Sequence, residues 1–300
     1  MSLTFAGPAP GRWLADALAP AFAVPGGAET VAGQVPRGYE AYARVFHPAR
    51  DDDGAPVRWA DIAALRGTVL HGGAQFADLA GLDEYGYALV EDAWDGDAPE
   101  QYGLPQPDLG HLAAVLAAHT TTPGALYLGL WPGYGWVRGG DAVSLLGTGP
   151  SQDDAGAPAG APAGGAAAAD GLQERLAMEA EAKRPAFGPE VLDGPQLSIG
   201  PEGYRSYLVF EGTSGDLAAP LWKDGRWSRE RQAPNLAWPR DRAWVLSTEL
   251  YEDSTIIAGS AALVRELSAH AGLEVRAVDA DTGLGADADR VNAAPDPGGP

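Results

Sequence analysis

Alternating apolar and polar positions predict strands in several parts of the chain. Residues 39–46 (YEAYARVF) combine aromatic and β-branched residues, and the turn-forming run Asp51-Asp52-Asp53-Gly54 follows shortly after them. Residues 204–211 (YRSYLVFE) alternate, and residues 242–251 (RAWVLSTELY) alternate over ten positions. Two shorter apolar segments are also predicted as strands: residues 125–131 and 273–278.

Helical spacing of apolar residues predicts helices between these strands. Residues 58–66 repeat large apolar residues at every third position. Residues 109–119 follow Asp108, and residues 261–270 follow Ser260, which are residue types that favour the N-cap. The strands outnumber the helices and do not alternate with them strictly. The pattern therefore predicts an α+β fold with a mixed, partly antiparallel sheet and a few short helices.

Composition divides the chain into one main body and three segments outside it. Residues 154–170 consist mostly of Ala, Gly and Pro, so they have too little apolar surface to offset the entropy of ordering them. We expect a flexible insertion there, followed by a short charged helix at 172–183. The expected order is a N-terminal extension (1–36), the first part of the body (37–146), the insertion with its helix (147–184), the second part of the body (185–280) and a disordered tail (281–300).

The charge balance narrows the class of partner. The chain has 20 Lys and Arg against 41 Asp and Glu, a net charge of −21. Such a protein repels nucleic-acid phosphates and anionic membrane surfaces, whereas a basic protein remains a compatible partner. The 300 residues contain no cysteine, which excludes disulfides and cysteine nucleophiles. With no signal-peptide pattern and no apolar run of about 20 residues, we expect a soluble, cytoplasmic protein.

The common motifs of catalysis and cofactor binding do not occur. The sequence has no phosphate-binding P-loop, no dinucleotide-binding GxGxxG after a strand, no GxSxG nucleophile elbow and no HExxH. His111 and His119 share a predicted helix, but eight residues separate them by about 12 Å along its axis. The acidic runs at 51–54 and 279–289 lack the spacing of a calcium-binding loop. We therefore expect no metal and no cofactor.

Several charged residues lie within otherwise apolar predicted strands, namely Arg44, Glu211, Arg242 and Glu249. An unpaired charge in a half-buried strand is strongly unfavourable, so we expect Glu249 to pair with Arg44 or Arg242. Such a pair either stabilises the fold or forms a polar site on one sheet face, framed by Trp238 and Trp244. Three further acidic residues flank the predicted strand at 242–251: Asp241, Glu252 and Asp253.

The segment 131–136 (WPGYGW) is the second candidate site. Trp131, Tyr134 and Trp136 stand in a Gly- and Pro-rich loop, where aromatic side chains can stack on a sugar or a peptide. The same side chains can instead fold back and fill the core beneath the loop. Both interpretations remain open at this point.

Three motifs resemble a group of uncharacterised bacterial proteins from high-GC genomes. They are YARVFHPA (42–49), HTTTPGALYLGLWPGYGW (119–136) and PNLAWPRDRAW (234–244). The resemblance extends over most of residues 37–279 apart from the insertion, and it implies no catalytic role for any residue. The tryptophan-containing strand that leads through Gly-Ser to a helix is also loosely similar to bacterial toxin-immunity proteins, which is an analogy of pattern only.

Two hypotheses of function follow. The first is a non-enzymatic binding protein, with immunity-like neutralisation of a basic partner protein as its most concrete form. The alternative is a hydrolase that acts on a small molecule and uses Glu211 and Glu249 as acid and base. The alternative requires these two carboxylates to share one cleft.

Overall fold

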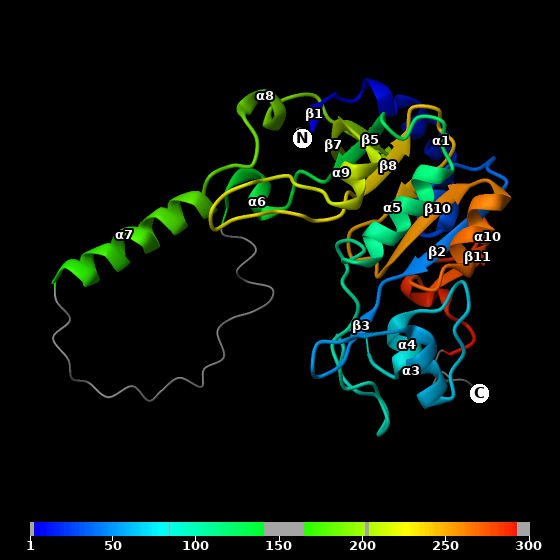
Figure 1. Cartoon of the computed structure of the whole chain (residues 1–300). Coiled ribbons are helices and arrows are strands. Elements are labelled where there is room, and N and C mark those ends of the chain that lie inside the picture. Colours follow the sequence, from blue (N-terminus) through cyan, green and yellow to red (C-terminus); the bar gives the residue numbers. More distant parts are fainter. Residues whose placement is uncertain (1–2, 84, 141–164, 202–203, 293–300) are drawn as a thin grey trace.

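An antiparallel sheet organises the computed structural model, which describes residues 3–83, 85–140, 165–201 and 204–292 (Figure 1). Within these ranges the main sheet has nine strands, and every pairing in it is antiparallel. The order is β1 (Thr4–Phe5), β7 (Arg205–Gly212), β5 (Leu126–Leu130), β8 (Leu236–Pro239), β9 (Val245–Ser247), β10 (Ser254–Gly259), β2 (Ala41–Phe46) and β11 (Val275–Val278), with β6 (Leu197–Ile199) paired to the start of β7. A small second sheet pairs β3 (Ala49–Arg50) with β4 (Pro56–Val57). The predicted α+β class is confirmed.

Alternation along the strands gives the sheet two buried faces. In β5, Leu126 and Leu128 belong to one apolar cluster, while Tyr127 between them packs on the other. The first face is covered by three helices: α5 (Asp108–Ala118), α9 (Ser214–Ala218) and α10 (Ala261–Ala269). The second face is covered by α1 (Arg12–Phe22) and α2 (Val31–Gln34).

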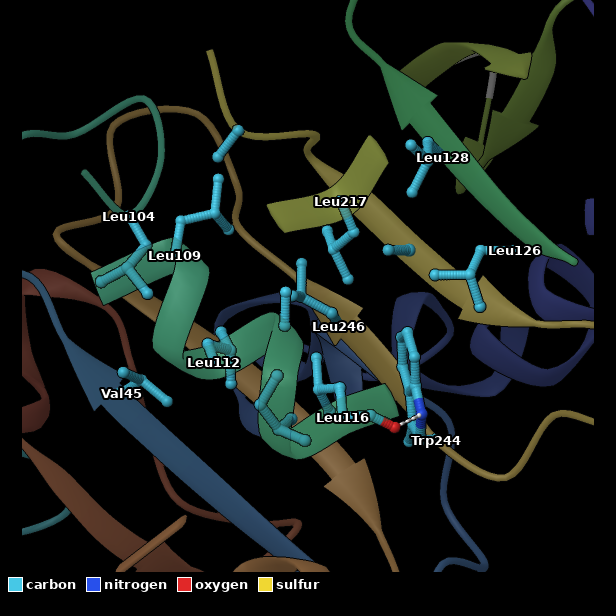
Figure 2. Packing of buried hydrophobic residues seen from close by; sticks show 14 of the residues in the cluster. Val45, Leu104, Leu109, Leu112, Leu116, Leu126, Leu128, Leu217, Trp244 and Leu246 are labelled. Atoms are coloured by element: carbon cyan, nitrogen blue, oxygen red, sulfur yellow. Dashed lines mark hydrogen bonds between the residues drawn. The ribbon is translucent and has the colours of Figure 1, made fainter. Parts of the chain in front are cut away.

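The core on the first face is built around α5. Figure 2 shows Leu112 and Leu116 of this helix directed at the strands, with Trp244 beside them. The indole nitrogen of Trp244 donates a hydrogen bond to the carbonyl oxygen of Leu116 at 2.9 Å. Because both the ring and its polar atom are satisfied inside the core, Trp244 is part of the scaffold.

A third apolar cluster lies at one end of the sheet. It joins the end of β2 to α3 (Trp59–Arg66) and α4 (Phe76–Ala80), which Figure 1 shows at the opposite end of the molecule from α1. The ring of Trp59 packs between Phe46 and Phe76, at centroid distances of 4.7 and 5.1 Å.

Most predicted elements occur where the sequence places them, but the long strand predicted at 242–251 does not. Only Val245–Ser247 forms a strand, β9. Arg242 and Tyr251 have positive φ angles of 57° and 67°, a left-handed conformation that ends an extended segment on each side. The alternation of apolar residues is therefore real, but the chain turns before and after it.

The two ends of the described chain are part of the body. β1 pairs with β7, and α1 packs on the sheet, so residues 3–36 do not form a separate extension. The prediction of disorder from residue 281 onward is wrong for residues 281–292, because the buried carboxylate of Asp289 accepts hydrogen bonds from the backbone of Gln75 and from Asn292. Residues 293–300 lie outside the described residues.

The predicted insertion falls largely outside the described residues, which leave out 141–164. The helix after it, α7 (Gly165–Ala182), begins before the expected 172 and extends away from the sheet (Figure 1). No helix among the described residues is both long and apolar enough to cross a membrane. The remaining short elements are α6 (Gly135–Arg138), α8 (Pro189–Leu192), η1 (Ala9–Gly11), η2 (Gly27–Glu29) and η5 (Ala286–Ala288).

Candidate functional site

Arg44 is fully buried in β2 and held on several sides. Its Nε donates to Ser254 Oγ at 2.7 Å, and its Nη1 donates to the carbonyl oxygen of Ala74 at 2.7 Å. Its Nη2 lies 3.3 Å from Asp253 Oδ1, and the guanidinium stands 4.8 Å from the ring centre of Phe46. Burial lowers the pKa of Arg44, and the charge of Asp253 opposes that shift. These contacts make Arg44 a structural cation that ties the sheet to the third cluster.

Glu249 is paired, although not with either predicted arginine. Its Oε2 lies 2.9 Å from Nε of Arg205, and its Oε1 accepts a hydrogen bond from the Tyr207 hydroxyl at 2.7 Å. The predicted partners, Arg44 and Arg242, are wrong. The reason is that the chain leaves β9 after Ser247, which carries Glu249 to the beginning of β7 instead of along a continuing strand.

Glu211 and Glu249 do not share a cleft. Glu211 lies near the far end of β7 and pairs with Arg240 at 2.6 Å, whereas Glu249 contacts Arg205 and Tyr207 at its beginning. Four to six residues of extended strand separate these contacts by roughly 13–20 Å. The two carboxylates therefore cannot act on one substrate atom as acid and base.

The four candidate tryptophans and Tyr134 belong mainly to the core. Trp238 and Trp244 are buried in the clusters on opposite faces of the sheet, so they frame no open site. Tyr134 and Trp136 are also buried, and Trp131 is half-buried, so this loop folds back into the core. Burial raises the pKa of Tyr134 to about 12, and its hydroxyl accepts a hydrogen bond from Asn235. Arg242, the remaining candidate, is exposed and stacks on Trp13 with a distance of 4.5 Å to the ring centre.

The turn between β9 and β10 holds a carboxyl that titrates near neutral pH. Burial, followed by the neighbouring charge of Asp253, raises the pKa of Glu252 to about 7. Sequence reasoning placed both residues at a strand end but assigned them no role. A carboxyl with this pKa can give or take a proton at neutral pH.

His47, near this turn, is buried and neutral. Its Nδ1 lies 2.6 Å from the carbonyl oxygen of Glu100, which can only accept, so Nδ1 carries the hydrogen. Its Nε2 then accepts from the hydroxyl of Thr255 at 2.9 Å. Burial lowers the pKa of His47 to about 4, so the imidazole is a structural hydrogen-bonding group rather than a cation.

A second region combines exposed apolar side chains with acidic ones. We name residues 85–97 (YGYALVEDAWDGD), between α4 and α5, the acidic–aromatic loop. Tyr85 and Tyr87 are 77% and 71% exposed. Together with Leu89 and Val90 they account for four of the fifteen exposed large apolar residues in the described chain, within six consecutive positions. Clustering of this kind marks an interaction surface, whereas single exposed apolar residues are ordinary.

Hydrogen bonds fix the tip of the acidic–aromatic loop. The carboxylate of Asp83 accepts from the backbone nitrogens of Tyr85 and Tyr87 at 2.9 and 2.8 Å. The backbone nitrogen of Asp83 also donates to the carbonyl oxygen of Tyr87 at 2.8 Å. At the base of the loop, Trp94 N donates to Ala80 O at 2.9 Å. The exposed rings are thus presented on an ordered turn.

The charge of the acidic–aromatic loop is uniformly negative. It carries no Lys or Arg and four carboxylates: Glu91, Asp92, Asp95 and Asp97. Asp92 is paired with Arg66 of α3 at 3.1 Å. Sequence reasoning missed this surface, because an apolar stretch such as YALV does not reveal whether the fold covers it. The closely spaced Asp83, Gly86 and acidic residues were the available signal of a turn.

Groups of acidic and histidine side chains suited to a metal ion are absent from the described part of the chain. His119 lies 2.8 Å from Glu266, and His111 packs against His270, so the two predicted-helix histidines have separate partners. Comparison with known proteins found no matching family model, no matching curated protein and no matching solved structure.

Proposed function

We propose that this protein binds a basic partner protein through the acidic–aromatic loop, and that immunity-like neutralisation of that partner is its role. The observation that carries the proposal is the pair of exposed tyrosines, Tyr85 and Tyr87, on a hydrogen-bonded tip among carboxylates. We place this activity in the cytoplasm.

The energetics of binding favour such a surface. Tyrosines are enriched among the residues that dominate binding energy, because a rigid ring contributes contact area at small entropic cost. Asp83 already orders the tip, so less conformational entropy is lost when a partner docks. The carboxylates and the net charge of −21 attract cationic surfaces and accelerate their association.

Pairing of the buried charges supports a binding role over catalysis by the candidates from the sequence. Glu211 and Glu249 each have an arginine partner, and they lie toward opposite ends of β7. Arg44 uses its donors on Ser254 and on backbone carbonyls. None of these groups is left with an open position for a substrate within the described structure.

The test is a selection of short random peptides displayed on phage, carried out on the wild-type protein. We expect enrichment of peptides that combine Lys or Arg with an apolar residue. Binding of the enriched peptides should be lost in the double variant Tyr85→Ser/Tyr87→Ser and kept in Leu65→Ser, which removes an exposed apolar residue from α3. Enrichment of neutral or acidic peptides, or equal binding by both variants, would contradict the proposal.

A second candidate function is a carboxylate-dependent hydrolase, favoured by the pKa of about 7 at Glu252. It moves the hypothesised acid and base from Glu211 and Glu249 to the turn between β9 and β10. Turnover of chromogenic esters or glycosides that disappears in Glu252→Gln and persists in Glu211→Gln would establish it. Equal turnover by both variants, or none by the wild type, would reject it.

A further inference from the structure

A cavity lies at the beginning of α5, beside the base of the acidic–aromatic loop. Its volume is about 480 Å³, and its walls come from residues 100–109 and 231–233, with Arg50 on one side. Arg50 is joined to the loop through its backbone, since Arg50 N donates to Asp97 O at 3.1 Å and Asp97 N donates back at 2.8 Å. The cavity is large enough for a small organic molecule.

The charged groups at this cavity leave one positive charge over. Arg50 and Glu100 form an ion pair with 3.1 Å between Nη2 and Oε1. Arg231 also lines the cavity, is exposed, and has no ion-pair partner among the described residues. Two cations and one anion give a net charge of +1 at the cavity, in a chain whose net charge is −21. The position of this charge favours an anionic ligand.

The remainder of the cavity is apolar and ordered. Leu104 and Leu109 are buried residues that form part of its lining, and Ala233 lies opposite. The ring of Tyr102 forms a wall, and it meets the rings of Tyr134 and Tyr251 edge-on at 6.2 and 6.1 Å. A hydrogen bond of 2.9 Å from Gln232 Nε2 to the carbonyl oxygen of Tyr102 joins the two segments that form the walls. Such a wall suits a flat apolar group.

From these contacts we propose that the cavity binds a small monocarboxylate with a flat apolar body. The carboxylate pairs with Arg231, and the apolar body packs on Leu104 and Leu109 beside Tyr102. This site is separate from the exposed tyrosines of the proposed protein-binding surface, and it does not depend on that function.

The experiment titrates the full chain with benzoate, and with the neutral analogue benzamide, while line broadening and saturation transfer are followed by ligand-observed NMR. Benzoate should bind at least about tenfold more tightly than benzamide, because a charge-assisted hydrogen bond to an arginine is lost with the amide. Arg231→Gln should weaken benzoate binding by about the same factor and leave benzamide unchanged. The matched control is Arg226→Gln, an exposed arginine of the same segment that does not line the cavity.

Equal affinities for benzoate and benzamide, or equal benzoate affinities of the Arg231→Gln and Arg226→Gln variants, would overturn the proposal. Absence of benzoate binding at millimolar concentration would overturn it as well. Because Arg231 is exposed and makes no ion pair among the described residues, the melting temperature of the variant should stay at the wild-type value, which excludes unfolding as the cause of lost binding. The variant Tyr85→Ser/Tyr87→Ser should retain benzoate binding, which separates this site from the proposed protein-binding surface.

Discussion

The sheet end around Arg44 and the acidic–aromatic loop depart from ordinary residue placement in opposite directions. At the sheet end, charged side chains are buried, as Arg44 and Glu249 are. In the loop, large apolar side chains are exposed, as Tyr85 and Tyr87 are. Both arrangements are unfavourable for an isolated chain in water unless a partner compensates for them.

The difference between the two regions lies in where the compensating partner is. Arg44 has its partners within the fold, in Asp253, Ser254 and backbone carbonyls. The rings of Tyr85 and Tyr87 remain exposed to solvent. An unusual residue placement that the fold itself satisfies is structural, whereas one that the fold leaves open indicates a contact surface. Four predictions test this distinction, from the largest expected effect to the smallest.

Arg44→Met should produce the largest loss of stability. The substitution leaves the Asp253 carboxylate without its cation and the carbonyls of Gly72 and Ala74 without a donor. We expect a loss of about 3–5 kcal/mol in the free energy of unfolding, measured by urea titration and circular dichroism. Arg242→Met, which removes an exposed arginine, should cost about 1 kcal/mol or less. Similar losses in the two variants would remove the distinction between buried and exposed charge.

Glu252→Gln should change how stability depends on pH. The folded-state pKa of about 7 lies above the ordinary value of 4.5, so the folded protein holds this proton more tightly than the unfolded chain. The contribution is present below the unfolded pKa and is lost as pH rises through the folded pKa, a decrease of about 3 kcal/mol.

The glutamine variant lacks this titration, so its stability relative to the wild type should rise by about that amount between about pH 5 and about pH 8. His47 titrates in the opposite sense, since its pKa is lowered to about 4, but it affects both proteins equally. Urea unfolding at the two pH values measures the change. A constant difference between variant and wild type would mean that Glu252 is ionised in both states at neutral pH.

Tyr85→Ser/Tyr87→Ser should affect binding and leave folding almost unchanged. The two rings are exposed, so their removal should alter the free energy of unfolding by no more than about 0.5 kcal/mol. Binding of a selected basic peptide should weaken by at least about tenfold, as measured by isothermal titration calorimetry. A large loss of stability would instead place these rings in the core of the folded state.

Asp83→Ala should have the smallest effect. It removes the acceptor for the backbone nitrogens of Tyr85 and Tyr87, so the tip loses its fixed conformation while the sheet is untouched. Peptide affinity should fall several-fold, since the binding event must then order the tip. Asp287→Ala removes an equal charge from a remote exposed position and is the control. Equal losses in both variants would indicate that charge alone, and not the ordered tip, controls the affinity.

Local pattern was sufficient to predict much of the fold. The alternation at 204–211 corresponds to β7, and Ser260 caps α10 through a hydrogen bond from Leu263 N at 3.1 Å. The shortening of β9 could not be predicted, because a left-handed conformation at Arg242 and Tyr251 is imposed by tertiary contacts and not by their residue types.

The candidate site was predicted less well than the fold. The need for Glu249 to have a cationic partner followed from its sequence position, but the identity of that partner, Arg205, depends on how β7 and the end of β9 meet in space. The acidic–aromatic loop was missed for a related reason, since hydrophobic pattern alone does not reveal which apolar residues the fold covers.

Hydrogen exchange followed by mass spectrometry, on the full chain with and without a selected basic peptide, tests the central claim most directly. The account predicts slower exchange in residues 85–97 when the peptide is bound, and unchanged exchange in residues 248–253 around the turn between β9 and β10. Protection confined to residues 248–253, with the acidic–aromatic loop unaffected, would contradict the account and identify the buried charges as the functional site.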